Sequence, residues 1–138
     1  MASSSVAGAV VAGQKRPLVP AVAAALGERF GDRYVTSEAV RQHHGRDESA
    51  YDITPPDAVV FALSTEDVAF TLALANRYSV PVIAYGAGSS LEGHLLAVQG
   101  GICLDLSRMN NILEVDAAEG IAVVEAGVRL ADAHTAAQ

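Results

Sequence analysis

Apolar residues in the middle of the chain recur with two different periods, one typical of strands and one of helices. Residues 58–63 and 81–85 are short apolar runs of strand length, and the second run opens with a proline. Between them, a Ser-Thr-Glu-Asp start at 64–67 is followed by apolar positions at helical spacing that fade near 78–79. This pattern predicts a β-α-β unit with parallel strands and a right-handed crossover.

The residues after this unit predict a glycine-rich loop, three further strands and a final helix. Residues 102–107 alternate with a period of two, which places Ile102, Leu104 and Leu106 on one face and Cys103, Asp105 and Ser107 on the other. Residues 112–116 and 121–126 read as strands joined by a four-residue hairpin connection, and a helix starts at Val128 after Gly127. The order β-α-β, loop, β-β-β-α predicts an α+β fold with helices against a mixed sheet.

The first part of the chain predicts a tail and a helical lead-in. Residues 1–16 read as a disordered tail of small residues, whose two adjacent basic residues argue against a targeting segment. Residues 17–54 predict one helix over 21–30, opened by prolines, and another near 38–43. The main domain is expected from 55 to 138, and the net charge is +1 before residue 51 and −8 after it.

Composition narrows the function classes. A length of 138 residues, of which 51% are hydrophobic, fits one globular domain. The net charge of −7 argues against a partner that is duplex nucleic acid or an anionic membrane surface. No apolar run reaches the roughly 20 residues of a transmembrane helix. The single cysteine excludes an intrachain disulfide framework and a cysteine-rich metal site.

The glycine-rich segment 86–94, Gly-Ala-Gly-Ser-Ser-Leu-Glu-Gly-His, carries the strongest chemical signal. A strand that leads directly into such a loop presents successive backbone N–H groups, which can bind a diphosphate. No Lys or Arg lies between Arg77 and Arg108, so the backbone would supply most of the stabilisation. The segment lacks the third glycine of the dinucleotide fingerprint and the lysine and hydroxyl of the nucleotide triphosphate loop. A glycine-rich turn without a ligand stays the alternative.

Several motifs together resemble a known family. Residues 44–49 (His-Gly-Arg-Asp-Glu-Ser), 55–60 (Pro-Pro-Asp-Ala-Val-Val), 86–94 and 99–110 resemble the FAD-linked D-2-hydroxyacid dehydrogenases, within the vanillyl-alcohol-oxidase type of flavoproteins. The resemblance extends over about residues 44–130 and is strongest to cytochrome-linked D-lactate dehydrogenases and to the D-type subunit of glycolate oxidase. It implies the N-terminal half of a PCMH-type FAD-binding domain.

The resemblance also implies FAD as cofactor and the residues that contact it. The glycine-rich loop is expected to wrap the diphosphate, and residues 125–128 to lie along the cofactor. The family usually has Glu-Pro-Gly-Val there. Ala126 in place of the proline gives the unfolded chain more freedom, which lowers the free energy of unfolding by about 0.4–1 kcal/mol. The expected FAD-binding residues are Gly86, Ala87, Gly88, Ser89, Ser90, Leu91, Gly93, His94, Gly127 and Val128.

The implied activity is the oxidation of D-lactate, or a related D-2-hydroxyacid, to the 2-oxoacid, with electrons passed to a cytochrome or quinone. A protein similar to the D-type subunit of glycolate oxidase, or a truncated fragment without activity, are the alternatives. No catalytic or metal-binding residue is assigned, because the family's lie in a further domain, and the chain reads as the first half of a flavoenzyme. The expected location is the cytoplasm, including the inner face of the membrane, or the mitochondrion in a eukaryote.

The histidines and the cysteine are expected to play minor roles. His43 and His44 read as solvated surface, His94 as a support for the loop, and His134 as exposed. Cys103 reads as an inert strand residue.

Overall fold

Four short strands form the central sheet of the protein, shown in a computed structural model that describes residues 15–137. Their order is β1-β2-β4-β3, with bounds Tyr34–Val35, Ala58–Phe61, Ile102–Asp105 and Val82–Tyr85. β2, β4 and β3 are parallel and β1 is antiparallel to β2, so the sheet is mixed, as predicted. Most of the predicted disordered tail lies outside the described residues.

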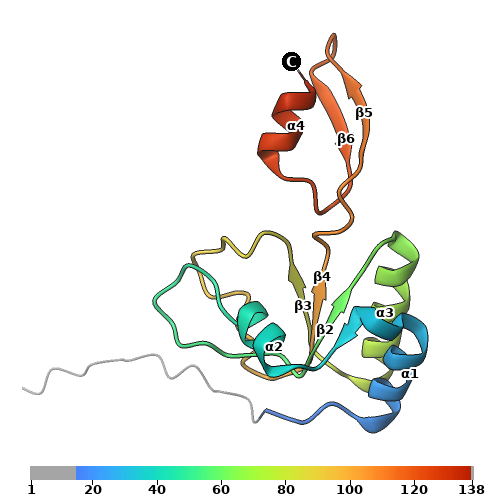
Figure 1. Ribbon diagram of the computed structural model, residues 1–138, viewed down its shortest axis with the longest axis vertical. Helices are drawn as coiled ribbons and strands as arrows, with labels where there is room; N and C mark the ends of the chain where they lie inside the picture. The colour runs from blue at the N-terminus through green and yellow to red at the C-terminus, as the bar shows by residue number, and fades with distance from the viewer. Residues whose placement is uncertain (1–14, 138) are drawn as a thin grey trace, which may run out of the picture.

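Helices cover both faces of this sheet (Figure 1). On one face, α1 (Pro20–Phe30) and α3 (Thr65–Tyr78) pack against apolar side chains that include Val60, Ile102 and Leu104. On the other face, α2 (Glu38–His44) lies near Val59 and Cys103. The predicted alternation of residues 102–105 between two faces is therefore confirmed, and both faces are buried.

The β-α-β unit forms with its two strands parallel, but they are not neighbours. β4 lies between β2 and β3, because Ile102, Cys103 and Leu104 are apolar on both faces and suit a central, fully buried strand. Ser64 caps α3 by accepting a hydrogen bond from the Asp67 N–H at 3.3 Å, and the helix ends at Tyr78, followed by Ser79 as its C-cap.

The first part of the chain contains more than helices. α1 and α2 match the two predicted helices, but a 3₁₀ turn (η1, Gly31–Arg33) and β1 lie between them. A strand of two residues is too short for sequence periodicity to reveal. The predicted boundary at residue 55 stays a prediction. Within the described residues, no helix is long and apolar enough to span a membrane.

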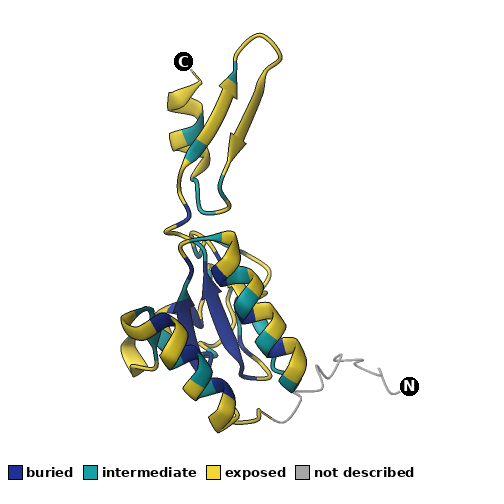
Figure 2. Cartoon of the chain, turned by 90° about the vertical axis from the view of Figure 1, so that its right-hand side faces the viewer, coloured by how far each residue is buried: buried dark blue, intermediate teal, exposed yellow. Residues whose placement is uncertain are grey.

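The last three elements form a unit that projects from the main body (Figures 1 and 2). β5 (Ile112–Asp116) and β6 (Ile121–Val124) form a separate antiparallel sheet, followed by α4 (Leu130–Ala136). Residues 15–137 therefore form two sheets where the sequence predicted one. This hairpin unit keeps many apolar side chains exposed, including Leu113, Ile121 and Leu130.

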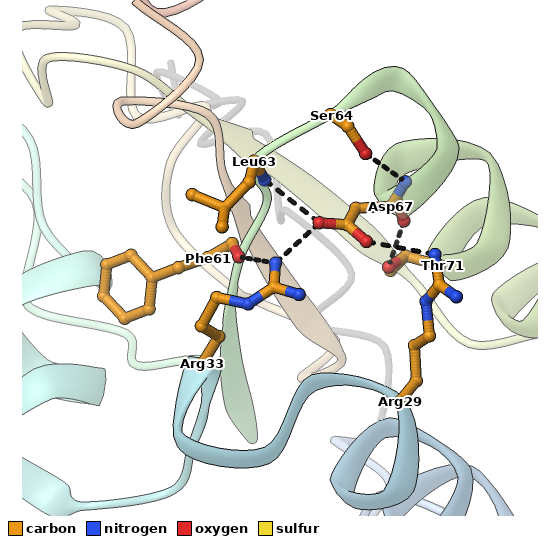
Figure 3. A network of polar contacts seen from close by, with 7 residues as sticks. All are labelled: Arg29, Arg33, Phe61, Leu63, Ser64, Asp67 and Thr71. Atoms are coloured by element: carbon orange, nitrogen blue, oxygen red, sulfur yellow. Dashed lines mark hydrogen bonds and ion pairs between the residues drawn. The ribbon is translucent and has the colours of Figure 1, made fainter.

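A buried carboxylate ties the helices to the sheet (Figure 3). Asp67 accepts hydrogen bonds from Arg33 at 2.6 Å, from Arg29 at 3.3 Å and from the Leu63 N–H at 3.1 Å. Arg33 also donates to the Phe61 carbonyl at 3.1 Å. One side chain of α3 thus joins α1, η1 and the end of β2.

Asp67→Asn tests this network. Burial raises the pKa of Asp67, but the Arg33 hydrogen bond and its other partners outweigh burial and lower it. A lowered pKa contributes stability that is lost as the pH falls below about 4. We expect Asp67→Asn to reduce the free energy of unfolding by about 2–3 kcal/mol at neutral pH, and by less in acid. Urea unfolding at both pH values measures the difference.

The control is Glu66→Gln, which removes an exposed acid from the same helical turn. It should change the free energy of unfolding by less than about 0.5 kcal/mol. Equal effects of the two substitutions would show that the network does not stabilise the fold.

Candidate flavin site

The carboxyl ends of three parallel strands meet at the edge of the sheet that faces the hairpin unit (Figure 1). Ligands of open α/β sheets bind at such edges, where the loops after the strands converge. The loop after β3 and the turn after β4 line a cavity of about 220 Å³ here, together with the start of α4. Its lining residues are Gly86, Ala87, Ser107, Asn110, Gly127, Arg129 and Asp132.

A larger cavity of about 470 Å³ lies at the opposite edge, near the amino ends of β3 and β4. It is lined in part by Leu18, Val80 and Pro81, and it includes none of the predicted site residues. The Asp57 carboxylate there accepts a hydrogen bond from the Gly101 N–H at 2.6 Å. Of these two cavities, the smaller one is lined by residues that the sequence predicted for the site.

The first half of the glycine-rich loop has free hydrogen-bond donors. Among residues 15–137, the backbone N–H groups of Ala87, Gly88 and Ser89 have no acceptor. Gly88 has a φ of +72°, and a Cβ there would overlap the Tyr85 hydroxyl. At Gly86 a Cβ would meet no atom within 4 Å. This half of the loop is open toward an anion.

The second half of the loop is held by the protein itself. The Glu48 N–H donates to the Ser90 carbonyl at 2.8 Å, and Ser90 Oγ lies 2.8 Å from His94 Nδ1. Hydrogen bonds from Ser49 are the main cause of a lowered pKa at Asp47, and the Gly93 N–H and Ser90 hydroxyl act in the same direction. An acid of the chain thus faces the donors of this half.

The predicted FAD-binding residues are therefore divided by the structure. Gly86, Ala87 and Gly127 line the cavity, and the free N–H groups of Gly88 and Ser89 follow directly. The other five predicted residues lie outside the lining: Ser90, Leu91, Gly93, His94 and Val128. Their contacts with FAD stay predictions, and the contact between His94 and Ser90 fits the expected supporting role.

Gly127 joins the hairpin unit to the main body at the cavity. A Cβ at this position would overlap the Leu106 carbonyl oxygen, and the Gly127 N–H donates to the Met109 carbonyl at 2.8 Å. Only glycine permits this close approach of two backbones. Val128 is half-buried beside it, and its N–H donates to the Glu125 carbonyl at 3.1 Å.

A buried pair lies at the end of β4. Asp105 Oδ2 is 2.8 Å from His44 Nε2, and Asp105 Oδ1 accepts a hydrogen bond from the Ser107 N–H at 2.7 Å. Burial raises the pKa of Asp105, but these hydrogen bonds outweigh it, so the pKa is lowered. His44 Nδ1 lies 2.9 Å from the Val40 carbonyl oxygen, so both ring nitrogens of His44 face oxygen atoms of the protein.

The expectation of a solvated His43-His44 surface was wrong for His44. His43 is exposed, but His44 is only 4% exposed and its ring lies 4.4 Å from that of Tyr85. Its partner Asp105 is distant in sequence, which hides the pair from local patterns. The sequence held one signal of this pair: Asp105 is an acid at the end of an apolar strand. A buried charge of this kind requires a partner.

The remaining expectations for single side chains agree with the structure. Cys103 is fully buried, and burial, followed by the nearby Asp105 charge, raises its pKa to about 12. His134 is exposed in α4.

The FAD binding domain family matches residues 56–138, which include the loop and the cavity. The chain belongs to this family. FAD is accordingly the cofactor of the fold, as the sequence predicted.

Curated relatives agree with the family. The chain is 40% identical over 99 residues to "Probable D-lactate dehydrogenase, mitochondrial" of Danio rerio, a match that covers 71% of the chain and 20% of the relative. It is 33% identical over 122 residues to "D-lactate dehydrogenase [cytochrome], mitochondrial" of Arabidopsis thaliana, a match that covers 87% of the chain and 22% of the relative. It is 35% identical over 89 residues to "Glycolate oxidase subunit GlcD" of Bacillus subtilis, covering 61% and 19%. The chain thus spans about a fifth of these relatives.

Solved structures confirm the predicted α+β, PCMH-type fold. An alkyldihydroxyacetonephosphate synthase superposes with a TM-score of 0.76 at 25% identity, covering 90% of the chain and 25% of that structure. A p-cresol methylhydroxylase superposes with a TM-score of 0.74 at 20% identity, covering 89% of the chain and 26% of that structure.

Asp105→Asn tests the buried pair. The substitution leaves a buried His44 without its charged partner, so we expect the free energy of unfolding to fall by about 3 kcal/mol. Urea unfolding measures this loss. Asp116→Asn, at an exposed hairpin turn where the carboxylate accepts from the Ala118 and Glu119 N–H groups, is the control and should cost about 1 kcal/mol or less. Equal losses would contradict the importance of the pair.

Cys103 supplies a test of the central strand. Because the thiol is buried and its pKa is raised to about 12, we expect no reaction with a disulfide reagent in the folded protein at mildly alkaline pH. Reaction of the single thiol should appear only on unfolding in urea. Rapid labelling of the folded protein would show that β4 is accessible to solvent.

Proposed function

We propose that the chain is the FAD-binding part of a flavin-dependent oxidoreductase that oxidises D-lactate or a related D-2-hydroxyacid to the 2-oxoacid. The observation that carries the proposal is the row of free N–H groups at Ala87, Gly88 and Ser89, beside a cavity at the carboxyl end of β3. Successive backbone N–H groups are suited to a diphosphate.

The cavity fits the diphosphate part of FAD. Its volume of about 220 Å³ is below the roughly 300–1,000 Å³ of pockets that enclose whole small ligands, so it accommodates only part of a dinucleotide. Neutral donors contribute to the lining, from the loop N–H groups and from Ser107 and Asn110, and the charged side chains of Arg129 and Asp132 complete it. Gly86 leaves space for close approach, because no side chain stands there.

In this proposal the chain's own residues bind and orient the cofactor. When bound, FAD supplies the acceptor for the hydride of the hydroxyacid. The loop N–H groups hold the diphosphate without a cation between Arg77 and Arg108. The hairpin unit contacts the main body at Gly127, and its residues Gly127, Arg129 and Asp132 line the cavity together with the loop. No residue of the chain is given a catalytic role.

The names of the relatives support the choice of substrate and acceptor. Two of them are named D-lactate dehydrogenases, one of which carries the word cytochrome, so we favour D-lactate with a cytochrome or quinone as electron acceptor. The Bacillus subtilis relative favours glycolate as the alternative substrate. Both D-lactate dehydrogenases are named mitochondrial, which supports that location in a eukaryote; in a bacterium we propose the cytoplasm, including the inner face of the membrane.

Substrate choice is tested in the full-length gene product loaded with FAD. D-lactate added without oxygen should bleach the visible absorption of the flavin faster than glycolate does. Faster bleaching by glycolate would select the alternative, and bleaching by neither would contradict a hydroxyacid dehydrogenase.

Gly86→Val tests the cofactor site. The new side chain would enter open space beside the free N–H groups, so the fold should be retained while FAD binds roughly tenfold or more weakly. Titration with FAD, followed by flavin fluorescence, measures the affinity, and circular dichroism checks the fold. Gly88 is unsuitable, because a Cβ there overlaps Tyr85 whether or not FAD is bound.

The matched control is Gly27→Ala in α1, where the nearest atom to a new Cβ is 3.9 Å away. This variant should bind FAD as the wild type does. Unchanged FAD affinity in folded Gly86→Val would show that the diphosphate does not lie beside this part of the loop.

A further inference from the structure

Arg129 is the one basic side chain among the residues that line the candidate site. It immediately precedes α4 and is far in sequence from the glycine-rich loop, yet it faces the same cavity as Gly86 and Ala87. Its guanidinium makes two hydrogen bonds to Asp132, from Nε at 2.8 Å and from Nη2 at 3.0 Å. Asp132 lines the cavity as well.

We propose that Arg129 is an FAD-binding residue, and that Asp132 occupies its guanidinium until the diphosphate replaces the carboxylate. This inference rests on the proposed function. A guanidinium binds carboxylate and phosphate oxygens with the same two-pronged geometry, so the exchange conserves its hydrogen bonds. The diphosphate carries more negative charge than one carboxylate, which favours the exchange.

The exposure of the pair makes this exchange easy. The side chains of Arg129 and Asp132 are 73% and 49% exposed, so water and salt screen their attraction. The buried pair of His44 and Asp105, by contrast, is enclosed by the core. Of these two ion pairs at this edge of the sheet, the exposed one is suited to exchange partners.

The other arginines of the second half of the chain have different surroundings. The guanidinium of Arg108 lies 4.4 Å from the centre of the Phe61 ring, and that of Arg77 lies 5.6 Å from the centre of the Tyr78 ring. Neither lines the cavity. Arg129 therefore supplies the positive charge that the loop sequence lacks, and it comes from an element that only the fold brings near.

Arg129→Gln and Asp132→Asn should have opposite effects on FAD affinity in the full chain. Loss of the guanidinium should weaken FAD binding roughly tenfold, as expected for one charge-assisted hydrogen bond. Loss of the competing carboxylate should strengthen binding about threefold, the scale of an exposed ion pair. Arg77→Gln removes the same charge away from the cavity and should leave the affinity unchanged.

The double variant separates competition from simple repulsion. If Asp132 acts by occupying Arg129, the gain from Asp132→Asn should be smaller in the Arg129→Gln background. The dependence of FAD affinity on salt should also be weaker in Arg129→Gln than in the wild type, because one contact with a phosphate charge is lost.

The results distinguish this inference from the proposed function. Failure of the wild type to bind FAD would overturn both. FAD binding by the wild type that is unchanged in Arg129→Gln would overturn the role of Arg129 alone. A gain from Asp132→Asn that is equal in both backgrounds would show that the carboxylate does not compete for Arg129.

Discussion

The Asp105 carboxylate at the end of the central strand is the interaction on which the candidate site depends. One of its oxygens meets His44, at the end of α2, and the other accepts from Ser107, which begins the turn after β4. The turn continues to Met109, whose carbonyl accepts from Gly127 and so anchors the hairpin unit. The buried Asp105 carboxylate thus holds both the turn after β4, which lines the cavity, and the end of α2.

Residues 45–54, which follow α2, hold part of the glycine-rich loop in place. The Glu48 N–H binds the Ser90 carbonyl, and Asp47 faces the donors of the second half of the loop. The backbone of residue 48 therefore holds residue 90, whereas the N–H groups of residues 87–89 have no acceptor among the described residues.

Local signals predicted the elements well, and spatial relations less well. The Ser64 cap and the helical spacing after it predicted α3, and the family motifs predicted the α+β fold and FAD. The position of β4 between β2 and β3 depends on burial of both its faces, which a period of two does not reveal. His44 pairs with Asp105, and Arg129 lines the cavity, through contacts between residues far apart in the chain. A single sequence does not show such contacts.

The backbone amides of the loop offer the most direct test of the central claim, that FAD binds through Ala87, Gly88 and Ser89. Two-dimensional NMR spectra of the isotope-labelled chain, recorded while FAD is added, follow each amide separately. The largest shifts should occur at these three residues, with smaller ones at Ser107, Asn110 and Gly127 across the cavity. Shifts confined to the larger cavity at the opposite edge of the sheet, or no shifts at saturating FAD, would contradict the claim.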